Sequence, residues 1–100
     1  MFCSGQLGLN EATGMLEDSI IGQTKRALDN LAEVLKAEGL GMEDVVKTTV
    51  YLADIGLYAQ MNEEYARHFR APFPARTTLA ASLPRSALIE IDAIARKKSA

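Results

Sequence analysis

One hundred residues, of which 48% are hydrophobic and 24% charged, predict one soluble globular domain over residues 1–100. The net charge of −2 offers no basic surface for nucleic acid, and no apolar run approaches the ~18 residues of a membrane helix. The single cysteine, Cys3, cannot form an internal disulfide, and the N-terminus lacks the pattern of a secretory signal. These features predict a cytoplasmic protein without nucleic-acid or membrane partners.

A strand is predicted over residues 1–9, and the Asn-Glu-Ala-Thr-Gly sequence of residues 10–14 then has the composition of a turn. Within this strand, Ser4-Gly5-Gln6 has two interpretations. It is either a glycine bulge against which another element packs, or the backbone and hydroxyl wall of a small pocket. The residues alone favour the bulge.

Residues 19–38 predict the first helix, because apolar residues recur there at helical spacing while charged residues lie off the stripe. Gly39 supplies the left-handed conformation that ends this helix. We assign the helix no chemical role. Its stripe consists of Ile20, Thr24, Ala27, Leu28, Leu31, Val34 and Leu35.

Residues 45–52 predict a strand that is rich in β-branched side chains and largely apolar on both faces. A layer of helices covers only one face of a sheet, and a chain of this length has no further helix for the other face. We therefore expect the protein to associate with copies of itself.

Residues 58–69 predict a second helix, with Tyr58, Met61, Tyr65 and Phe69 on its apolar stripe. Asn62 falls on the same stripe, where a buried amide without partners costs about 1–3 kcal/mol. The simplest interpretation of Asn62 is a side chain that caps a strand or loop backbone.

His68 is the only histidine and lies near the end of this helix, off the stripe and without an obvious carboxylate partner. We expect a surface residue that the helix dipole favours, and a poor candidate for a catalytic base. No Cys/His cluster suits zinc, and no glycine-rich loop suits phosphate. Neither a metal nor a cofactor is expected.

Residues 73–95 predict two strands joined at Leu83-Pro84-Arg85-Ser86, because proline ends one run and cannot enter the next. If these strands pair as a hairpin, Arg76 and Glu90 are offset by about three residues, or roughly 10 Å. That gap suits a small anion held between the two side chains. Arginine binds a carboxylate through its planar fork, and a nearby carboxylate can position water for hydrolysis. The alternative is a structural ion pair.

The order strand, helix, strand, helix, strand, strand predicts an α+β fold, a mixed sheet with both helices on one face.

The pattern Pro-Ala-Arg-Thr-Thr…Leu-Pro…Ile-Glu-Ile-Asp-Ala-Ile-Ala, over residues 74–95, resembles the C-terminal signature of the RidA family of YjgF-type reactive intermediate deaminases. This family is also described as endoribonuclease L-PSP or translation initiation inhibitors. Three further stretches resemble the family in the same order: Ser-Gly-Gln at 4–6, Asp-Val-Val-Lys-Thr-Thr-Val-Tyr-Leu at 44–52, and Asn-Glu-Glu-Tyr at 62–65.

The resemblance implies a fold like that of AroH-type chorismate mutase and a homotrimer with clefts between its subunits. It also implies hydrolysis of enamine or imine intermediates, such as 2-iminobutanoate and 2-iminopropanoate, to 2-oxo acids and ammonia without cofactor or metal. Arg76 would clamp the substrate carboxylate, and Glu90 would orient or activate the attacking water. The other substrate-binding residues would be Ser4, Gly5, Asn62 and Thr78, of which Ser4 and Gly5 would line the pocket and Asn62 would support it. Thr78 stands where the family often has cysteine, which excludes thiol chemistry there.

Two features depart from the family pattern. The family usually begins with a further strand whose Gly-Pro-Tyr tyrosine reaches the pocket, whereas this sequence begins just before Ser4. Residues 76–84 are also one residue shorter than the pattern, and a slip of one residue would turn Arg76 to the opposite face. A non-catalytic trimer that binds small carboxylates is therefore an alternative function. A ribonuclease or translation-inhibitor role is disfavoured by the acidic charge.

Overall fold

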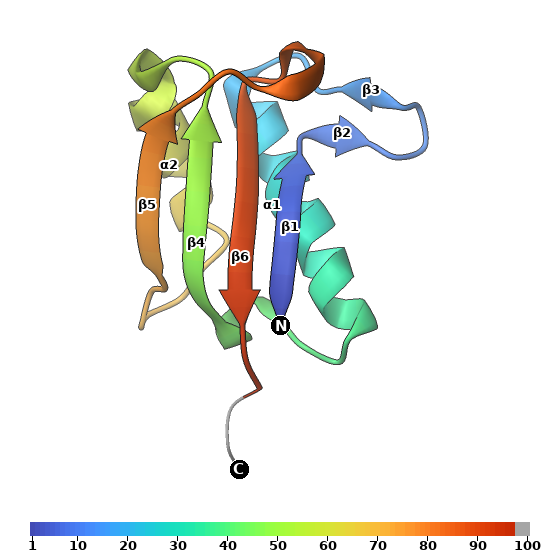
Figure 1. Ribbon diagram of the computed structural model, residues 1–100, viewed down its shortest axis with the longest axis vertical. Helices are drawn as coiled ribbons and strands as arrows, with labels where there is room; N and C mark the ends of the chain where they lie inside the picture. Colours follow the sequence, from blue (N-terminus) through green and yellow to red (C-terminus); the bar gives the residue numbers. More distant parts are fainter. Residues whose placement is uncertain (98–100) are drawn as a thin grey trace.

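The computed structural model describes residues 1–97 and is built around one mixed four-stranded sheet with two helices on one side of it (Figure 1). The helices are α1 (Ile20–Ala37) and α2 (Tyr58–Ala66). Strands β4 and β5 are parallel, while the other two pairings are antiparallel. The prediction of an α+β fold with both helices on one face is confirmed. Across the sheet the strands lie in the order β1 (Phe2–Leu7), β6 (Ile89–Ala95), β4 (Val45–Leu52) and β5 (Ala75–Ala80).

Helix α1 has the boundaries that its sequence predicts. The Ser19 hydroxyl accepts a hydrogen bond from the Gly22 N–H at 3.0 Å and so caps the first turn, and Gly39 follows the last turn with φ +73°. The predicted stripe faces the sheet, and every member is buried except Val34, which is half-buried against the core. This stripe and the facing side chains of β4 and β6 make one continuous core.

The predicted hairpin of the last two strands is wrong, because β4 lies between β5 and β6. Strand β4, helix α2 and strand β5 form a β–α–β unit, and such a crossover returns the chain parallel to its first strand. The chain then crosses the end of β4 through a short helical turn, η3 (Pro84–Ser86), in which Arg85 and Ser86 both have left-handed backbone angles. Strand β6 consequently pairs with the other edge of β4.

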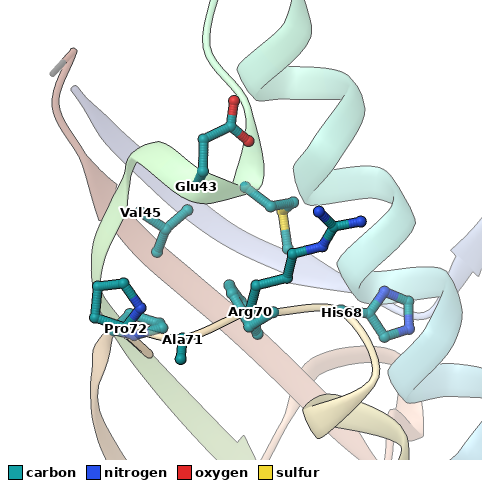
Figure 2. A pocket seen from close by; sticks show the side chains of 9 residues that line it. Glu43, Val45, His68, Arg70, Ala71 and Pro72 are labelled. Carbon is teal, nitrogen blue, oxygen red and sulfur yellow. The ribbon is translucent and has the colours of Figure 1, made fainter.

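Helix α2 ends at Ala66, three residues earlier than predicted. Phe69 nevertheless remains buried and packs on Tyr65, with 4.8 Å between the ring centroids. Residues 67–74 then lead to β5 past the beginning of β4, where Val45 lies between Pro72 and Glu43 (Figure 2). Glu43 belongs to a short helical turn, η1 (Met42–Asp44), that precedes β4.

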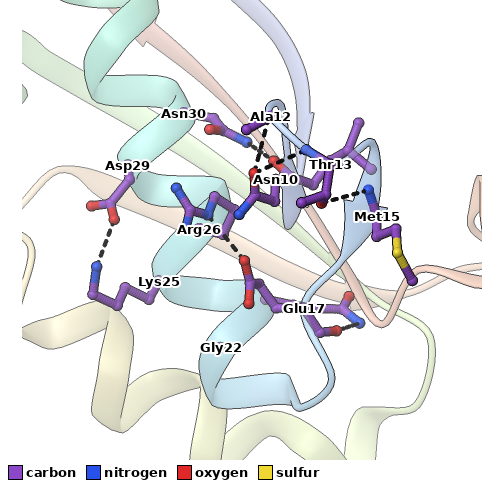
Figure 3. A network of polar contacts seen from close by, with 12 residues as sticks. Asn10, Ala12, Thr13, Met15, Glu17, Gly22, Lys25, Arg26, Asp29 and Asn30 are labelled. Carbon is purple, nitrogen blue, oxygen red and sulfur yellow. Dashed lines mark hydrogen bonds and ion pairs between the residues drawn. The ribbon is translucent and has the colours of Figure 1, made fainter.

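The predicted first strand, residues 1–9, divides into β1 and β2 (Leu9–Asn10), and β2 forms a small hairpin with β3 (Met15–Leu16), which the sequence does not predict. The turn predicted at residues 10–14 is confirmed, since the Asn10 carboxamide oxygen accepts the backbone N–H of Ala12 at 2.9 Å (Figure 3). Helix α1 anchors the hairpin, because Asn30 donates to the backbone oxygens of Leu7 and Leu9. In the same region Arg26 pairs with Glu17 at 3.2 Å.

His68 is not the surface residue that its sequence context predicts. Its side chain is only 16% exposed, and its Nε2 lies 2.9 Å from a carboxylate oxygen of Glu64. Its Nδ1 lies 4.0 Å from a carboxylate oxygen of Asp29 on α1. The sequence does contain a signal for Glu64, which lies four residues before His68, whereas Asp29 comes from another helix.

The face of the sheet opposite the helices carries exposed apolar side chains. Phe2 and Ile94 are paired across β1 and β6 and are 67% and 41% exposed, and Leu79 of β5 is 39% exposed. Phe2 and Ile94 alternate with buried neighbours that point toward the helices. Within residues 1–97, neither helix has the length and apolar character that a membrane span requires.

Candidate active site

Arg76 is the second residue of β5 and lies in register with Thr48 of β4, on the face that the helices cover. Its Nη1 donates to the Asn62 carboxamide oxygen at 2.7 Å, and its Nη2 donates to the Tyr58 hydroxyl at 2.6 Å. The guanidinium carbon also lies 4.7 Å from the centre of the Tyr65 ring, a cation–π distance. Arg76 is therefore held in place by one helix.

Tyr58, Asn62 and Tyr65 share one side of α2 because they are spaced by four and three residues. That side faces β5, so their polar groups converge on Arg76. The interpretation of Asn62 as a backbone cap is wrong, since its oxygen accepts from Arg76. The sequence places Tyr58 on the apolar stripe, but the residue is 40% exposed and its hydroxyl accepts a hydrogen bond from Arg76. Its four-residue spacing from Asn62 was the signal that could have identified it.

Tyr65 supports the guanidinium from inside the core. Its ring is 6% exposed, and its hydroxyl lies 2.7 Å from the Thr48 hydroxyl. Burial raises the pKa of Tyr65, while the hydrogen bond with Thr48 and the charge of Arg76 act in the opposite direction. The phenol is consequently neutral around pH 7, and its ring offers an uncharged π face to Arg76.

Part of the Arg76 guanidinium remains available for a ligand. Arginine has five N–H donors, and Asn62 and Tyr58 accept from two of them, which leaves three without an acceptor among residues 1–97. Two residues along β5, on the same face, the Thr78 hydroxyl is shielded from solvent and has no hydrogen-bond partner in this part of the chain. A cation and an unpaired hydroxyl thus lie together on a strand that pairs on one side only.

Glu90 lies in a second cluster, on the opposite face of the sheet. It is in register with Tyr51 of β4 and with Leu7 of β1, while its neighbours Ile89 and Ile91 point into the core. A β-bulge interrupts β1 between Cys3 and Gln6, and a Cβ atom at Gly5 would overlap the Glu90 carboxylate. The bulge interpretation of Ser4-Gly5-Gln6 is confirmed, and the Glu90 side chain packs directly on Gly5.

Ser4 occupies the same bulge and is exposed. Asp92, the other carboxylate of β6, accepts a hydrogen bond from the Tyr51 hydroxyl at 3.3 Å on the same open face as Glu90. The negative charge of Asp92 raises the pKa of Tyr51. The two carboxylates of β6 therefore belong to a polar strip along the uncovered side of the sheet.

Arg76 and Glu90 do not meet in one chain, contrary to the hairpin prediction. Strand β4 separates them, and Arg76 aligns with Thr48 whereas Glu90 aligns with Tyr51, so their side chains leave opposite faces. One small molecule cannot contact both groups of the same protomer. No cluster of three or more potential metal-binding side chains occurs within residues 1–97.

The sequence and fold match known proteins along the whole described chain. A family model described as Endoribonuclease L-PSP matches residues 1–97. The chain belongs to the RidA/YjgF family. This membership confirms the resemblance found in the four sequence stretches.

Two curated RidA relatives are named for deaminase activity. The chain is 47% identical over 97 residues to Reactive Intermediate Deaminase A, chloroplastic, of Arabidopsis thaliana, a match that covers 95% of this chain and 52% of that protein. It is 42% identical over 97 residues to human 2-iminobutanoate/2-iminopropanoate deaminase, covering 95% of this chain and 71% of the human protein. The chain thus spans about half the length of the plant relative.

Among solved structures, Escherichia coli TdcF with bound serine superposes with a TM-score of 0.92 at 31% identity, covering 97% of this chain and 80% of TdcF. The RidA/YjgF fold is therefore preserved from β1 to β6. The family match also extends over both polar clusters, the one around Arg76 and the one around Glu90.

Proposed function

We propose that this protein is a cytoplasmic RidA-type deaminase that hydrolyses 2-iminobutanoate and 2-iminopropanoate. In this reaction water adds to the carbon of the C=N bond, and the resulting carbinolamine releases ammonia to leave a 2-oxo acid. The names of the mammalian relatives support the substrate class. The single observation that carries the proposal is the oriented Arg76 guanidinium, which has N–H donors without an acceptor within residues 1–97.

Arg76 would bind the substrate carboxylate through its remaining N–H groups, as a planar fork suits two carboxylate oxygens. Asn62 and Tyr58 fix the guanidinium before substrate binds, so the side chain loses little conformational freedom on binding. The Thr78 hydroxyl would supply a further hydrogen bond, since it has no partner within residues 1–97. TdcF with bound serine supports a site for a small molecule that carries a carboxylate.

Glu90 would act from a neighbouring protomer in a trimer of the chorismate-mutase type. This arrangement is required because Arg76 and Glu90 of one chain face opposite sides of the sheet. The exposed apolar side chains of the uncovered sheet face support self-association. In the cleft, Glu90 would accept a proton from the attacking water and return it to the leaving nitrogen, while Ser4 and Gly5 would form the wall beside it.

The proposal is tested with purified protein and threonine dehydratase, which generates the imino acid in situ. We expect the wild-type chain to accelerate release of 2-oxobutanoate and ammonia. Arg76→Ala removes the charge that holds the carboxylate, so kcat/KM falls about 100-fold or more. Glu90→Gln keeps the shape and removes the base, so kcat falls by a similar factor while KM changes little.

Arg26→Ala is the matched control for Arg76→Ala, because Arg26 is an arginine of α1 that pairs with Glu17, away from both polar clusters and from the open face of the sheet. Its activity is expected to stay within twofold of wild type. A wild-type protein that leaves ammonia release at the uncatalysed rate would exclude the deaminase function.

The second candidate is a trimer that binds small carboxylates without turnover. The observation that favours it is the same set of free Arg76 donors, together with the serine in TdcF. Binding of 2-oxobutanoate that Arg76→Ala abolishes, in a protein without deaminase activity, would support this candidate.

A further inference from the structure

A hollow of about 500 Å³ lies away from both polar clusters, at the end of the sheet where β4 begins. Its walls come from η1, from the first residue of β4, and from residues 68–72 with Pro74 (Figure 2). Neither Arg76 and its partners Tyr58 and Asn62 nor Glu90 lines it. Its volume is within the range of small-molecule sites, about 300–1,000 Å³.

The floor of the hollow is apolar and belongs to the rigid core. Val45 and Phe69 are 6% and 8% exposed, and Met42 is packed against the same core. Pro72 and Pro74 add two stiff apolar walls. A ligand with an apolar body could therefore exclude water from this floor without a rearrangement of the protein.

The rim carries one acid and one base that are free for a ligand. Glu43 approaches from η1, and Arg70 approaches from the segment after α2, so they stand on different walls (Figure 2). Within residues 1–97 neither forms an ion pair or a side-chain hydrogen bond. The adjacent Arg67 and His68, in contrast, are paired with acidic residues of α2.

The two charges select the ligand class. Arg70 would attract a simple anion, but Glu43 would repel it. Glu43 would attract a simple cation, but Arg70 would repel it. A molecule with both an ammonium and a carboxylate satisfies both groups, because Arg70 can take the carboxylate through its fork and Glu43 can accept from the ammonium. We propose that this hollow is a second site that binds a free amino acid with an aliphatic side chain.

The test follows leucine binding by NMR of the full-length protein with ¹³C-labelled methionine and valine methyl groups. The Met42 and Val45 methyls report on the hollow, and Met42→Leu assigns the first signal. We expect saturable shifts of these methyls with a Kd in the millimolar range, about 1 mM. Arg70→Ala and Glu43→Gln should each weaken binding about tenfold. Arg76→Ala should leave binding unchanged.

Two comparisons decide between the ligand classes and between the sites. The leucine analogues 4-methylpentanoate, which lacks the amine, and 3-methylbutylamine, which lacks the carboxylate, should each bind about tenfold more weakly than leucine. Arg67→Ala is the matched control, since Arg67 is an exposed arginine of the same segment that does not line the hollow. Absence of saturation to about 20 mM leucine, equal binding of either analogue, or loss of binding in Arg76→Ala would overturn the proposal.

Discussion

At the scale of single residues, the orientation of Arg76 depends on two acceptors one helical turn apart. Asn62 accepts from Nη1 and Tyr58 from Nη2, while Tyr65 presents its ring. A guanidinium on an edge strand would otherwise sample many rotamers, and immobilising such a side chain on ligand binding costs about 0.5–1.5 kcal/mol. The helix removes this cost before the ligand binds.

Tyr58→Phe tests this orientation directly. The ring remains beside Arg76, but the hydroxyl that accepts from Nη2 at 2.6 Å is lost. Loss of one hydrogen bond of about 1 kcal/mol should raise KM for the imino acid about fivefold and leave kcat within about twofold. Thr13→Val is the control, since it also removes a hydroxyl, one that lies in the turn between β2 and β3 and away from both polar clusters. Equal KM values for the two variants would contradict the orienting role.

At the scale of elements, α1 and α2 are joined through a polar contact as well as through the core. His68 follows α2 and bridges the buried Glu64 and Asp29 of α1, at 2.9 and 4.0 Å. Glu64 is 7% exposed, and a buried carboxylate needs partners to offset its lost hydration. This contact therefore fixes the side of α2 that presents Tyr58 and Asn62.

His68→Ala should lower the free energy of unfolding by about 2 kcal/mol, because it leaves Glu64 with only the exposed Arg67 as a partner. Urea denaturation measures this change. Arg67→Ala is the control, since it removes a side chain that is 66% exposed from the same carboxylate and should cost at most about 0.5 kcal/mol. If the two variants are equally stable, the His68 contact contributes nothing beyond a surface ion pair.

At the scale of the whole molecule, the uncovered face of the sheet predicts the assembly. Phe2 and Ile94 face each other across β1 and β6 and remain exposed in the single chain. Phe2→Asp combined with Ile94→Asp should convert the proposed trimer into monomers, because charges cannot enter an apolar interface without partners. Sedimentation velocity measures the mass. Ile55→Asp, at an exposed site in η2 (Ile55–Leu57), should leave the assembly intact.

The proposed active site makes a stronger prediction about the assembly. Mixing equal amounts of unfolded Arg76→Ala and Glu90→Gln chains and refolding them gives random trimers. A shared site needs an intact Arg76 from one chain and an intact Glu90 from the next, and each is present with a probability of about one half. About a quarter of the sites are therefore intact. Activity should therefore rise from near zero to about a quarter of wild type. A mixture as inactive as its parents would exclude a shared site.

Several elements follow from the sequence because their signals are local. The stripe and caps of α1, the β-branched run of β4 and the turn at residues 10–14 each appear in the structure where their sequences predict them. Apolar spacing and capping act within a few residues, so no tertiary knowledge is needed. The family motifs likewise identify Arg76 and Glu90 without any coordinates.

The arrangement of these residues follows from tertiary packing. Strand β4 separates β5 from β6, and that insertion sends Arg76 and Glu90 to opposite faces. Strand order depends on crossovers through a helix, the partners of Arg76 depend on how α2 packs beside β5, and the approach of Asp29 to His68 depends on how α1 packs beside α2. Local sequence determines the elements of this protein, whereas contacts between residues far apart in the chain determine its sites, because those contacts form only when the elements pack.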